Sequence, residues 1–426
     1  ANYNTAMGYQ ALTTSTTATG NVALGFQAMQ DNTSGANNVA CGYQALHNNT
    51  TAGYNTAVGQ NALGSNTTGQ YQTAVGQGAL YASNADHNSA FGVSALGNCT
   101  TGVHNTAVGR NGASGLTTGT NNVAVGNYTM NGAVTGGSNI AVGYAALNAL
   151  TSGSNNTAVG RNSLVVLTSG GGNTAVGYQA MDATTTGNNN VAFGANALGA
   201  NTTGEMNTAI GVNALDANTT AHYNTAVGTH ALGANTAEGN TAVGYYALFA
   251  NTTGLYNVAV GRGALDANTT ANYNTAVGYD ALGANTTGAY NIAIGPSALS
   301  SNTTESYNLA MGTNAMVSAT GSTRCISIGV NALQQLTTGD RNVAIGVNAM
   351  VSATVAHDNV CIGEAAGYAL TDGNAYYNVA IGSYALDAAT SSSSNVAIGY
   401  GAGGNTTTGD GNVYVGSFAA GLATGA

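Results

Sequence analysis

Histidine, cysteine and acidic residues, the side chains that bind metals and move protons in proteins, are few and scattered in this sequence. The 426 residues include six His, four Cys and fifteen Asp and Glu. Acid–base catalysis and metal binding both need several such groups held close together. No phosphate loop, zinc-protease motif or nucleophile elbow is present either. We therefore expect neither an enzyme nor a site for a metal or cofactor.

The four cysteines show no pairing pattern. Cys41, Cys99, Cys325 and Cys361 lie far apart at unrelated places in the sequence. A disulfide framework or a metal site would need regular, close spacings. We interpret them as isolated buried thiols.

Tyrosine is the one chemically versatile residue that recurs at a regular spacing. The chain has 23 tyrosines, and most fall at two fixed places of a 17-residue period. Regularly spaced aromatic rings can stack on one another and shield a corner, or they can form an exposed stripe that binds glycans or a cell surface. Both interpretations stay open. The candidate stripe consists of Tyr54, Tyr71, Tyr223, Tyr256, Tyr273, Tyr290 and Tyr307.

The element that positions these tyrosines is a repeat of seventeen residues. It recurs 25 times, with two copies of sixteen and one of nineteen, and Asn55 to Tyr71 is a typical copy, numbered here as positions 1 to 17. Position 1 is nearly always Asn, position 3 Ala, position 4 apolar and position 5 always Gly. The tyrosines prefer positions 17 and 6. A period in this range is typical of a chain wound into stacked coils.

Positions 2 to 4 predict a short strand, because β-branched residues alternate there with alanine. The invariant glycine at position 5 indicates a turn with positive φ or with no room for a Cβ atom, and Pro296 at position 6 marks a corner. A second apolar pair at positions 8 and 9 fits a second strand or an inward bend. The predicted turn glycines include Gly8, Gly59, Gly126, Gly211, Gly295 and Gly399.

These features predict an all-β fold, a parallel β-solenoid of about 25 coils with a 17-residue repeat. We expect residues 1–426 to form one continuous domain without capping units, as part of a longer fibre or of rods stacked end to end.

The repeat also predicts which side chains lie inside. All charged residues fall at positions 6, 7, 10, 11 and 14 to 17, so we assign the other positions, including the apolar residues at 2, 4 and 9, to the interior. Alanines at positions 3 and 8 form two columns. They fill a narrow coil, or they allow close approach of a sister chain.

Polar side chains in columns predict ladders along the axis. Asn at position 1 and Thr at position 13 can hydrogen-bond from copy to copy. Turn chemistry creates many Asn-X-Ser/Thr sequons, and we expect them to be unmodified. A single threonine column gives little support to an ice-binding face, which is a remote alternative. The sequons include Asn66, Asn201, Asn218, Asn251, Asn268, Asn285 and Asn302.

Composition limits the classes of molecule that this chain could bind. Only 5% of residues are charged, lysine is absent, and the net charge is −10. Such a chain has no basic patch for nucleic acid, and no run of apolar residues is long enough to span a bilayer. Self-association remains, together with a possible glycan or cell-surface partner.

The run Asn121-Asn122-Val123-Ala124-Val125-Gly126 resembles the Asn-Ser-Val-Ala-Ile-Gly motif in the heads of trimeric autotransporter adhesins. Residues 290–295 and 395–399 match it similarly, and related repeats occur in phage tail-fibre-like proteins. The resemblance implies a left-handed coil, a parallel homotrimer and a place on a cell surface or virion. The repeat is longer than is usual in that family. We expect a structural fibre, with an adhesin or phage tail fibre as the alternative.

Overall fold

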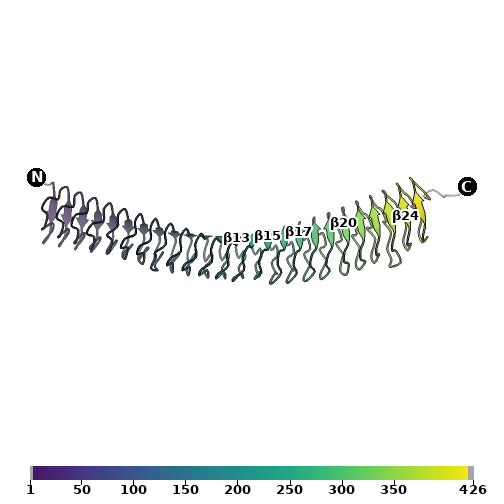
Figure 1. Cartoon of the computed structure of the whole chain (residues 1–426), viewed down its shortest axis with the longest axis horizontal. Coiled ribbons are helices and arrows are strands. Elements are labelled where there is room, and N and C mark those ends of the chain that lie inside the picture. The colour runs from purple at the N-terminus through teal and green to yellow at the C-terminus, as the bar shows by residue number, and fades with distance from the viewer. Residues whose placement is uncertain (1–2, 421–426) are drawn as a thin grey trace. The chain divides into compact units, whose positions relative to one another are not determined.

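The computed structural model describes residues 3–420, and its secondary structure there consists of short strands joined by turns, without a helix. Contacts divide the chain into two units, Ala1–Val212 and Asn213–Ala426, and the same coil recurs in both (Figure 1). Each coil contributes one three-residue strand at positions 2 to 4. The predicted all-β parallel solenoid with a 17-residue repeat is confirmed.

The strands of the first unit are β1 (Thr5–Met7), β2 (Val22–Leu24), β3 (Val39–Cys41), β4 (Thr56–Val58), β5 (Thr73–Val75), β6 (Ser89–Phe91), β7 (Thr106–Val108), β8 (Val123–Val125), β9 (Ile140–Val142), β10 (Thr157–Val159), β11 (Thr174–Val176), β12 (Val191–Phe193) and β13 (Thr208–Ile210). Those of the second unit are β14 (Thr225–Val227), β15 (Thr241–Val243), β16 (Val258–Val260), β17 (Thr275–Val277), β18 (Ile292–Ile294), β19 (Leu309–Met311), β20 (Ile326–Ile328), β21 (Val343–Ile345), β22 (Val360–Ile362), β23 (Val379–Ile381), β24 (Val396–Ile398) and β25 (Val413–Val415).

Neighbouring coils pair in parallel and in strict register. Equivalent positions face one another, as in Thr56 with Thr73, and the register survives both a shortened copy (Thr73 with Ser89) and the nineteen-residue copy (Val360 with Val379). The extra residues are therefore absorbed in the turns. Positions 8 and 9 form a bend rather than a second strand.

The interior differs from the prediction for positions 2 and 4. Alanine at position 3 points inward and is fully buried, whereas positions 2 and 4 point outward; in β4, Ala57 is buried while Thr56 and Val58 are half-buried or exposed. Side chains alternate along a strand, and the coil is so narrow that only the small residue fits inside. Both alanine columns therefore fill their own coil and do not form a contact surface for a sister chain.

Exceptions to the repeat show which positions meet inside the coil. Cys361 replaces alanine at position 3, and position 9 of the same coil is then Gly367, whose added Cβ would lie 2.5 Å from the cysteine sulfur. Tyr414 also replaces that alanine, and it packs against Gly403, the position 9 residue of the preceding coil. Volume is thus exchanged between positions 3 and 9, as expected of a close-packed core.

Glycine at position 5 has both properties predicted for it. Gly59 has a φ of 132°, and a Cβ atom there would lie 2.7 Å from the carbonyl carbon and oxygen of Gly76 in the next coil. The predicted turn glycines all have φ between 125° and 145°. No other residue can take this place without moving the adjacent coil.

Three further positions in each coil have left-handed backbone although they are rarely glycine. Asn61, Leu63 and Tyr71, at positions 7, 9 and 17 of one coil, have φ of 57°, 51° and 56°. Asparagine tolerates this region better than most residues, but leucine and tyrosine do not. Stacking against identical coils holds them there.

An asparagine ladder at position 1 joins the coils, as predicted. The Asn156 amide nitrogen donates to the Gly170 carbonyl at 2.9 Å, and the Asn156 Oδ1 accepts from the backbone N–H of Asn173 at 3.0 Å. Each amide therefore satisfies buried backbone groups in its own coil and the next. The predicted threonine ladder exists too, with hydroxyls that donate to the next coil, as from Thr252 to the Thr269 carbonyl at 3.0 Å.

Candidate functional site on the outside of the coil

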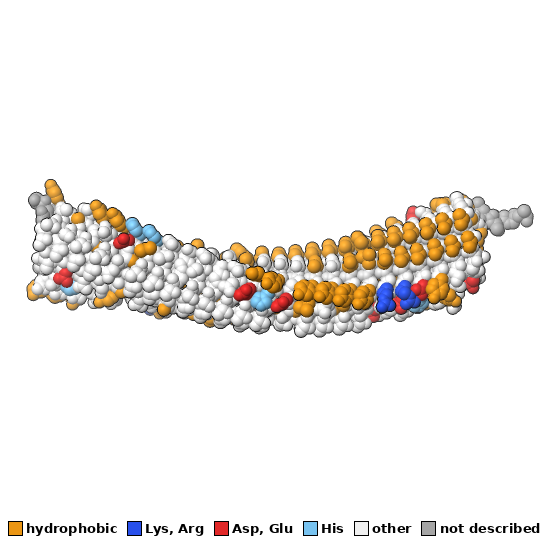
Figure 2. Space-filling model, viewed as in Figure 1, with side chains coloured by type: hydrophobic (Ala, Val, Ile, Leu, Met, Phe, Trp, Pro, Cys, Tyr) orange, Lys and Arg blue, Asp and Glu red, His pale blue; other side chains and the backbone are white. Residues whose placement is uncertain are grey.

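The outer sheet face, defined as the side chains at positions 2 and 4, is uncharged, and its side chains are half-buried or exposed. No strand carries a charged residue at either position. Ile292 and Ile294 of β18 are 40% and 36% exposed. In Figure 2 the apolar side chains of the second unit form parallel rows that run from each strand to the next along the stack of coils. Monomeric proteins rarely expose so long a continuous apolar patch.

This face is not uniform along the sequence. In the first unit, eight of thirteen strands have Thr or Ser at position 2, whereas in the second unit only three of twelve do. From β18 to β25 both positions are apolar in every strand. The eight strands of the first unit begin with Thr5, Thr56, Thr73, Ser89, Thr106, Thr157, Thr174 and Thr208, and the three of the second with Thr225, Thr241 and Thr275.

The predicted aromatic stripe is two separate stacks. Tyr54 and Tyr71 stack with centroids 5.0 Å apart, and two histidines continue that stack. Tyr290 and Tyr307 are nearly parallel, 5.1 Å apart, and close a stack that begins at Tyr256 and passes through Tyr273. The tyrosines of the predicted stripe remain between 48% and 63% exposed.

Tyr223 lies apart from both stacks, because the next coil is a sixteen-residue copy that ends in Gly239, at the place where other copies have position 17. Its ring contacts His222 at a tilted angle instead. Inside the stacks both faces of a ring are covered by its neighbours, as for Tyr71 and Tyr273, so the exposed parts of these inner rings are their edges and hydroxyls. A sugar packs against ring faces, and the stacked geometry therefore fits the shielding interpretation better than the glycan-binding one.

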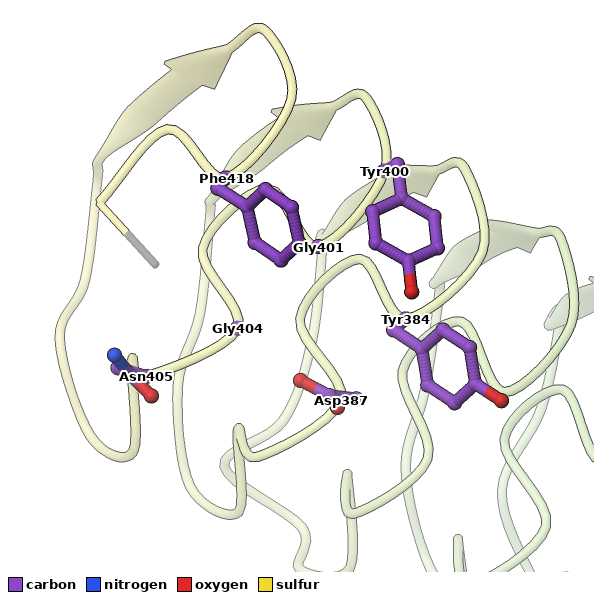
Figure 3. Close-up of a pocket in the computed structure, with 7 residues that line it drawn as sticks. All are labelled: Tyr384, Asp387, Tyr400, Gly401, Gly404, Asn405 and Phe418. Atoms are coloured by element: carbon purple, nitrogen blue, oxygen red, sulfur yellow. The ribbon is translucent and has the colours of Figure 1, made fainter. Parts of the chain in front are cut away.

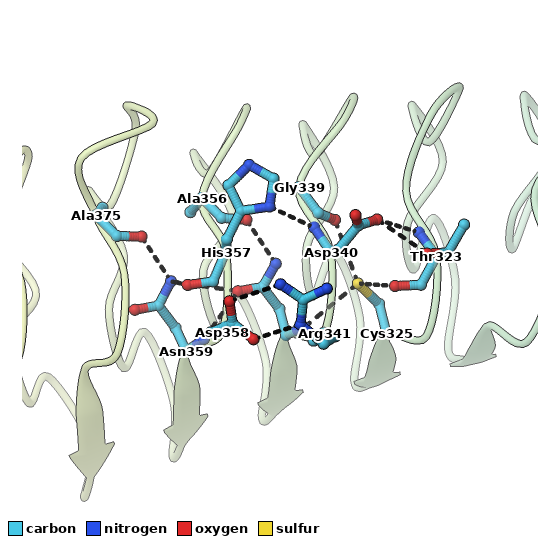
Figure 4. Close-up of polar contacts among 11 residues, drawn as sticks. Thr323, Cys325, Gly339, Asp340, Arg341, Ala356, His357, Asp358, Asn359 and Ala375 are labelled. Atoms are coloured by element: carbon cyan, nitrogen blue, oxygen red, sulfur yellow. Dashed lines mark hydrogen bonds and ion pairs between the residues drawn. The ribbon is translucent and has the colours of Figure 1, made fainter.

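Charged residues follow the second stack at the same position of the repeat. The Arg341 guanidinium pairs with Asp358 of the next coil, with Nε 2.5 Å from Oδ1 and Nη2 2.9 Å from Oδ2 (Figure 4). The arginine lowers the pKa of the Asp358 carboxyl, chiefly through this hydrogen bond. Surface pairs of this kind add little stability.

Position 16 forms a parallel line of polar contacts beside this ion pair. The Asp340 carboxylate accepts from the backbone N–H of Thr323 at 2.7 Å, and the Asp340 N–H donates to Nδ1 of His357 at 3.0 Å (Figure 4). His357 Nδ1 is therefore unprotonated in this arrangement. These groups support the turns between coils.

The cysteines split into two kinds. Cys99, Cys325 and Cys361 are buried, as predicted, and burial raises their pKa values to about 11, 11 and 12 respectively. Such thiols do not ionise near neutral pH and are inert. The prediction is wrong for Cys41, which lies at position 4 of β3 and is exposed on the outer sheet face. All four are free.

The sequon asparagines lie at position 12 and are fully buried. They form a second amide ladder that the sequence interpretation missed: the Asn268 amide donates to Asn251 Oδ1 at 2.8 Å, and the Asn285 amide donates to Asn268 Oδ1 at 3.0 Å. A glycan cannot be accommodated on such an amide in the folded coil. The recurrence of Asn at this position was the signal available in the sequence.

Residues 3–420 include no group of three or more His, Cys, Asp or Glu arranged to hold a metal ion. Within that range there is also no helix long and apolar enough to cross a membrane. No protein-family model matches the chain, and no curated protein matches it. The fold and its outer surface therefore define a class, a parallel β-solenoid repeat protein, and the function is inferred from the geometry alone.

Proposed function

We propose that this chain is a structural protein whose coils associate side by side through the outer sheet face to build a rigid fibre. The observation that carries the proposal is the uninterrupted pair of apolar columns from β18 to β25, whose side chains are half-buried or exposed. Burying apolar area at roughly 25 cal/mol per Å² makes such a face favourable to cover. Without charges at positions 2 and 4, nothing on it opposes close contact.

A second copy of this chain is the occupant that fits best. The columns present one side chain per coil at a constant spacing, so a partner that interlocks along eight strands must repeat at the same spacing. Identical stacked strands meet this condition, as in the interdigitated sheets of steric zippers. The resemblance to adhesin heads implies a parallel homotrimer and a location outside the cell or in a virion tail fibre.

Sedimentation velocity of the full chain tests this function. Ile345→Asp with Ile362→Asp places two carboxylates on the outer sheet face without touching the interior, and we expect a shift to monomer. Thr338→Asp, on an exposed turn position, is the matched control and should leave the oligomer intact. A wild-type chain that sediments as a monomer at all concentrations would refute the proposal.

A surface adhesin is the second candidate function, and its contacts would be made by the tyrosine edges and hydroxyls, which stay half-exposed, rather than by ring faces. Labelled protein should then bind cells or glycans, and Tyr273→Ala with Tyr290→Ala should remove that binding. Unchanged binding after these substitutions would eliminate the tyrosines from such a role. Oligomer formation, which depends on a different face, provides the control for correct folding.

A further inference from the structure

Hollows form on the corner of the coil where glycine occupies position 7. Elsewhere this column carries a side chain in left-handed conformation, such as Asn331 or Asn348. At Gly78, Gly263 and Gly401 the side chain is missing, and cavities of about 410, 240 and 280 Å³ open between the neighbouring coils. Two of these three hollows contain aspartate.

The hollow at Gly263 combines aromatic rings with carboxylates, and the Arg262 guanidinium, which lies over the Tyr279 ring, also lines it. Tyr245 and Tyr246 meet edge to face with centroids 4.4 Å apart. Tyr246 also contacts the His230 and Phe249 rings, whereas Tyr245 is not stacked flat on its neighbour as rings in the stacked column are. A Cβ added at Gly263 would lie 3.8 Å from the Asp280 carboxylate and 3.9 Å from that of Asp266. Both acids therefore border the space that the glycine leaves open.

The hollow at Gly401 also places aromatic rings beside a carboxylate (Figure 3). The Tyr400 ring meets Tyr384 at 74° and Phe418 at 81°. Gly404 opens the space further, because its added Cβ would lie 3.1 Å from Oδ1 of Asp387. Aromatic rings at varied angles and one carboxylate thus border a second hollow of similar size.

The aspartates in these hollows are partly desolvated. Burial is the main cause that raises the pKa values of Asp266 and Asp387, and Asp280 adds to the effect at Asp266. Neither belongs to the Arg341–Asp358 pair, which is the ion pair found among residues 3–420. A carboxylate has about four lone-pair sites, and backbone N–H groups use only part of that capacity in each.

We propose that the hollows at Gly263 and Gly401 each bind one pyranose ring of a neutral saccharide. The apolar C–H face of the sugar would pack on a tyrosine ring, and its hydroxyls would donate to Asp266 or Asp387. The cavities are smaller than those for drug-sized ligands, which suits a single ring. The net charge of −10 disfavours an acidic sugar. These positions lie off the outer sheet face, so the inference goes beyond fibre assembly and does not depend on it.

The hollow at Gly78 provides an internal control. It also arises from a glycine at position 7, but its lining contains Tyr81 with serine, asparagine and glycine residues, and no carboxylate. Cavity volume alone would let all three hollows bind a sugar. The proposed chemistry selects only the two with aspartate and several aromatic rings.

Saturation-transfer NMR on the full chain tests the proposal, with methyl glycosides of glucose, galactose, mannose and N-acetylglucosamine as probes. We expect transfer to at least one of them. Asp266→Asn with Asp387→Asn should weaken binding about tenfold, since a hydrogen bond to a charged group is lost. Gly263→Asn with Gly401→Asn should abolish it, because Asn, which this column already carries, fills the first hollow and presses on the Phe418 ring that borders the second. Gly78→Asn should change nothing.

Three results would overturn the inference. The first is no transfer to any probe from folded wild-type protein. The second is equal transfer in the wild type and in either double variant, with circular dichroism confirming the fold. The third is selective binding of tetramethylammonium, because the same rings and carboxylates would then form a site for an organic cation.

Discussion

The two units share one interior but differ on the outer sheet face. Position 3 is small and buried in strands of both, as Ala57 and Ala344 show. Position 2 is Thr or Ser in most strands before Val212 and Val, Ile or Leu in most strands after it. Because position 2 points outward, this difference does little for the coil itself. The difference indicates that the interior residues are required for the coil to form. The outer sheet face can vary, and it determines which surfaces the coil contacts.

The largest expected effect is the same in both units, because it concerns the interior. Gly126→Ala and Gly346→Ala each place a Cβ against the next coil's backbone at positive φ, and we expect a loss of about 3 kcal/mol or more in local stability. Hydrogen exchange of the flanking amides measures it. Gly78→Ala is the control, since position 7 carries Ala145 elsewhere. A much milder effect in one unit would show that the interiors differ.

The next largest effect, on self-association, should differ between the two units. Ile345→Asp with Ile362→Asp should weaken self-association by about 3 kcal/mol, more than a hundredfold, because unpaired carboxylates would be buried. Val159→Asp with Val176→Asp, on the threonine-bearing face of the first unit, should have a clearly smaller effect. Sedimentation equilibrium gives both constants. Equal losses would mean that both faces contribute alike.

Breaking the asparagine ladder should lower stability by less than the glycine substitutions do, and by a similar amount in either unit. Asn156→Ala leaves the Gly170 carbonyl and the Asn173 N–H without this hydrogen-bond partner. We expect a loss of about 2 kcal/mol in the free energy of unfolding. Cys325 already replaces the ladder amide in the second unit, where its thiol donates to the Gly339 carbonyl and accepts from the Asn342 N–H, both at 3.4 Å, and a thiol is only a weak donor and acceptor. Cys325→Asn should therefore stabilise that region by about 1 kcal/mol. Thermal melts of the two variants test this pair, and a loss of stability in Cys325→Asn would contradict it.

The smallest effect depends on pH. Burial and Asp280 raise the pKa of Asp266 in the folded chain above the value of about 3.9 expected when unfolded. The folded state then binds the proton more tightly, so stability is lost as the pH rises through these two values. Asp266→Asn should be slightly more stable than wild type at pH 7 and equal to it at pH 3. A gain that persists at pH 3 would exclude ionisation as the cause.

Much of the coil could be predicted from the sequence, because the repeat reports each position many times. The strand at positions 2 to 4, the corner at Gly59 and the ladder through Asn156 all follow from residue type and spacing. The left-handed backbone at positions 7 and 17 had a signal in the frequent Asn and Gly there. At position 9 it had none, since leucine is not expected in that conformation.

The direction of the strand's faces could not be predicted, since alternation shows that positions 2 and 4 share a face but not which face is inside. Side-chain hydrophobicity predicted the wrong face as the interior, because the larger apolar residues such as Ile294 lie outside and alanine lies inside. The width of the coil decides this, and width depends on how the turns close. For the same reason the tyrosine column could be predicted as an aromatic row, but not as stacked rings whose faces are covered.

Thiol accessibility tests the central claim most directly, namely that the outer sheet face of the second unit is covered by another copy. Ile398→Cys introduces a thiol at position 4 of β24, where the side chain is exposed in one chain, and Cys41 supplies a natural exposed thiol at position 4 of β3. The other three thiols are buried, so we expect them not to react with the label. In the intact full-length protein, maleimide should label Cys41 quickly and the new thiol slowly, and dilution to monomers should remove the difference. Equally fast labelling of both thiols in the undiluted protein would contradict the account.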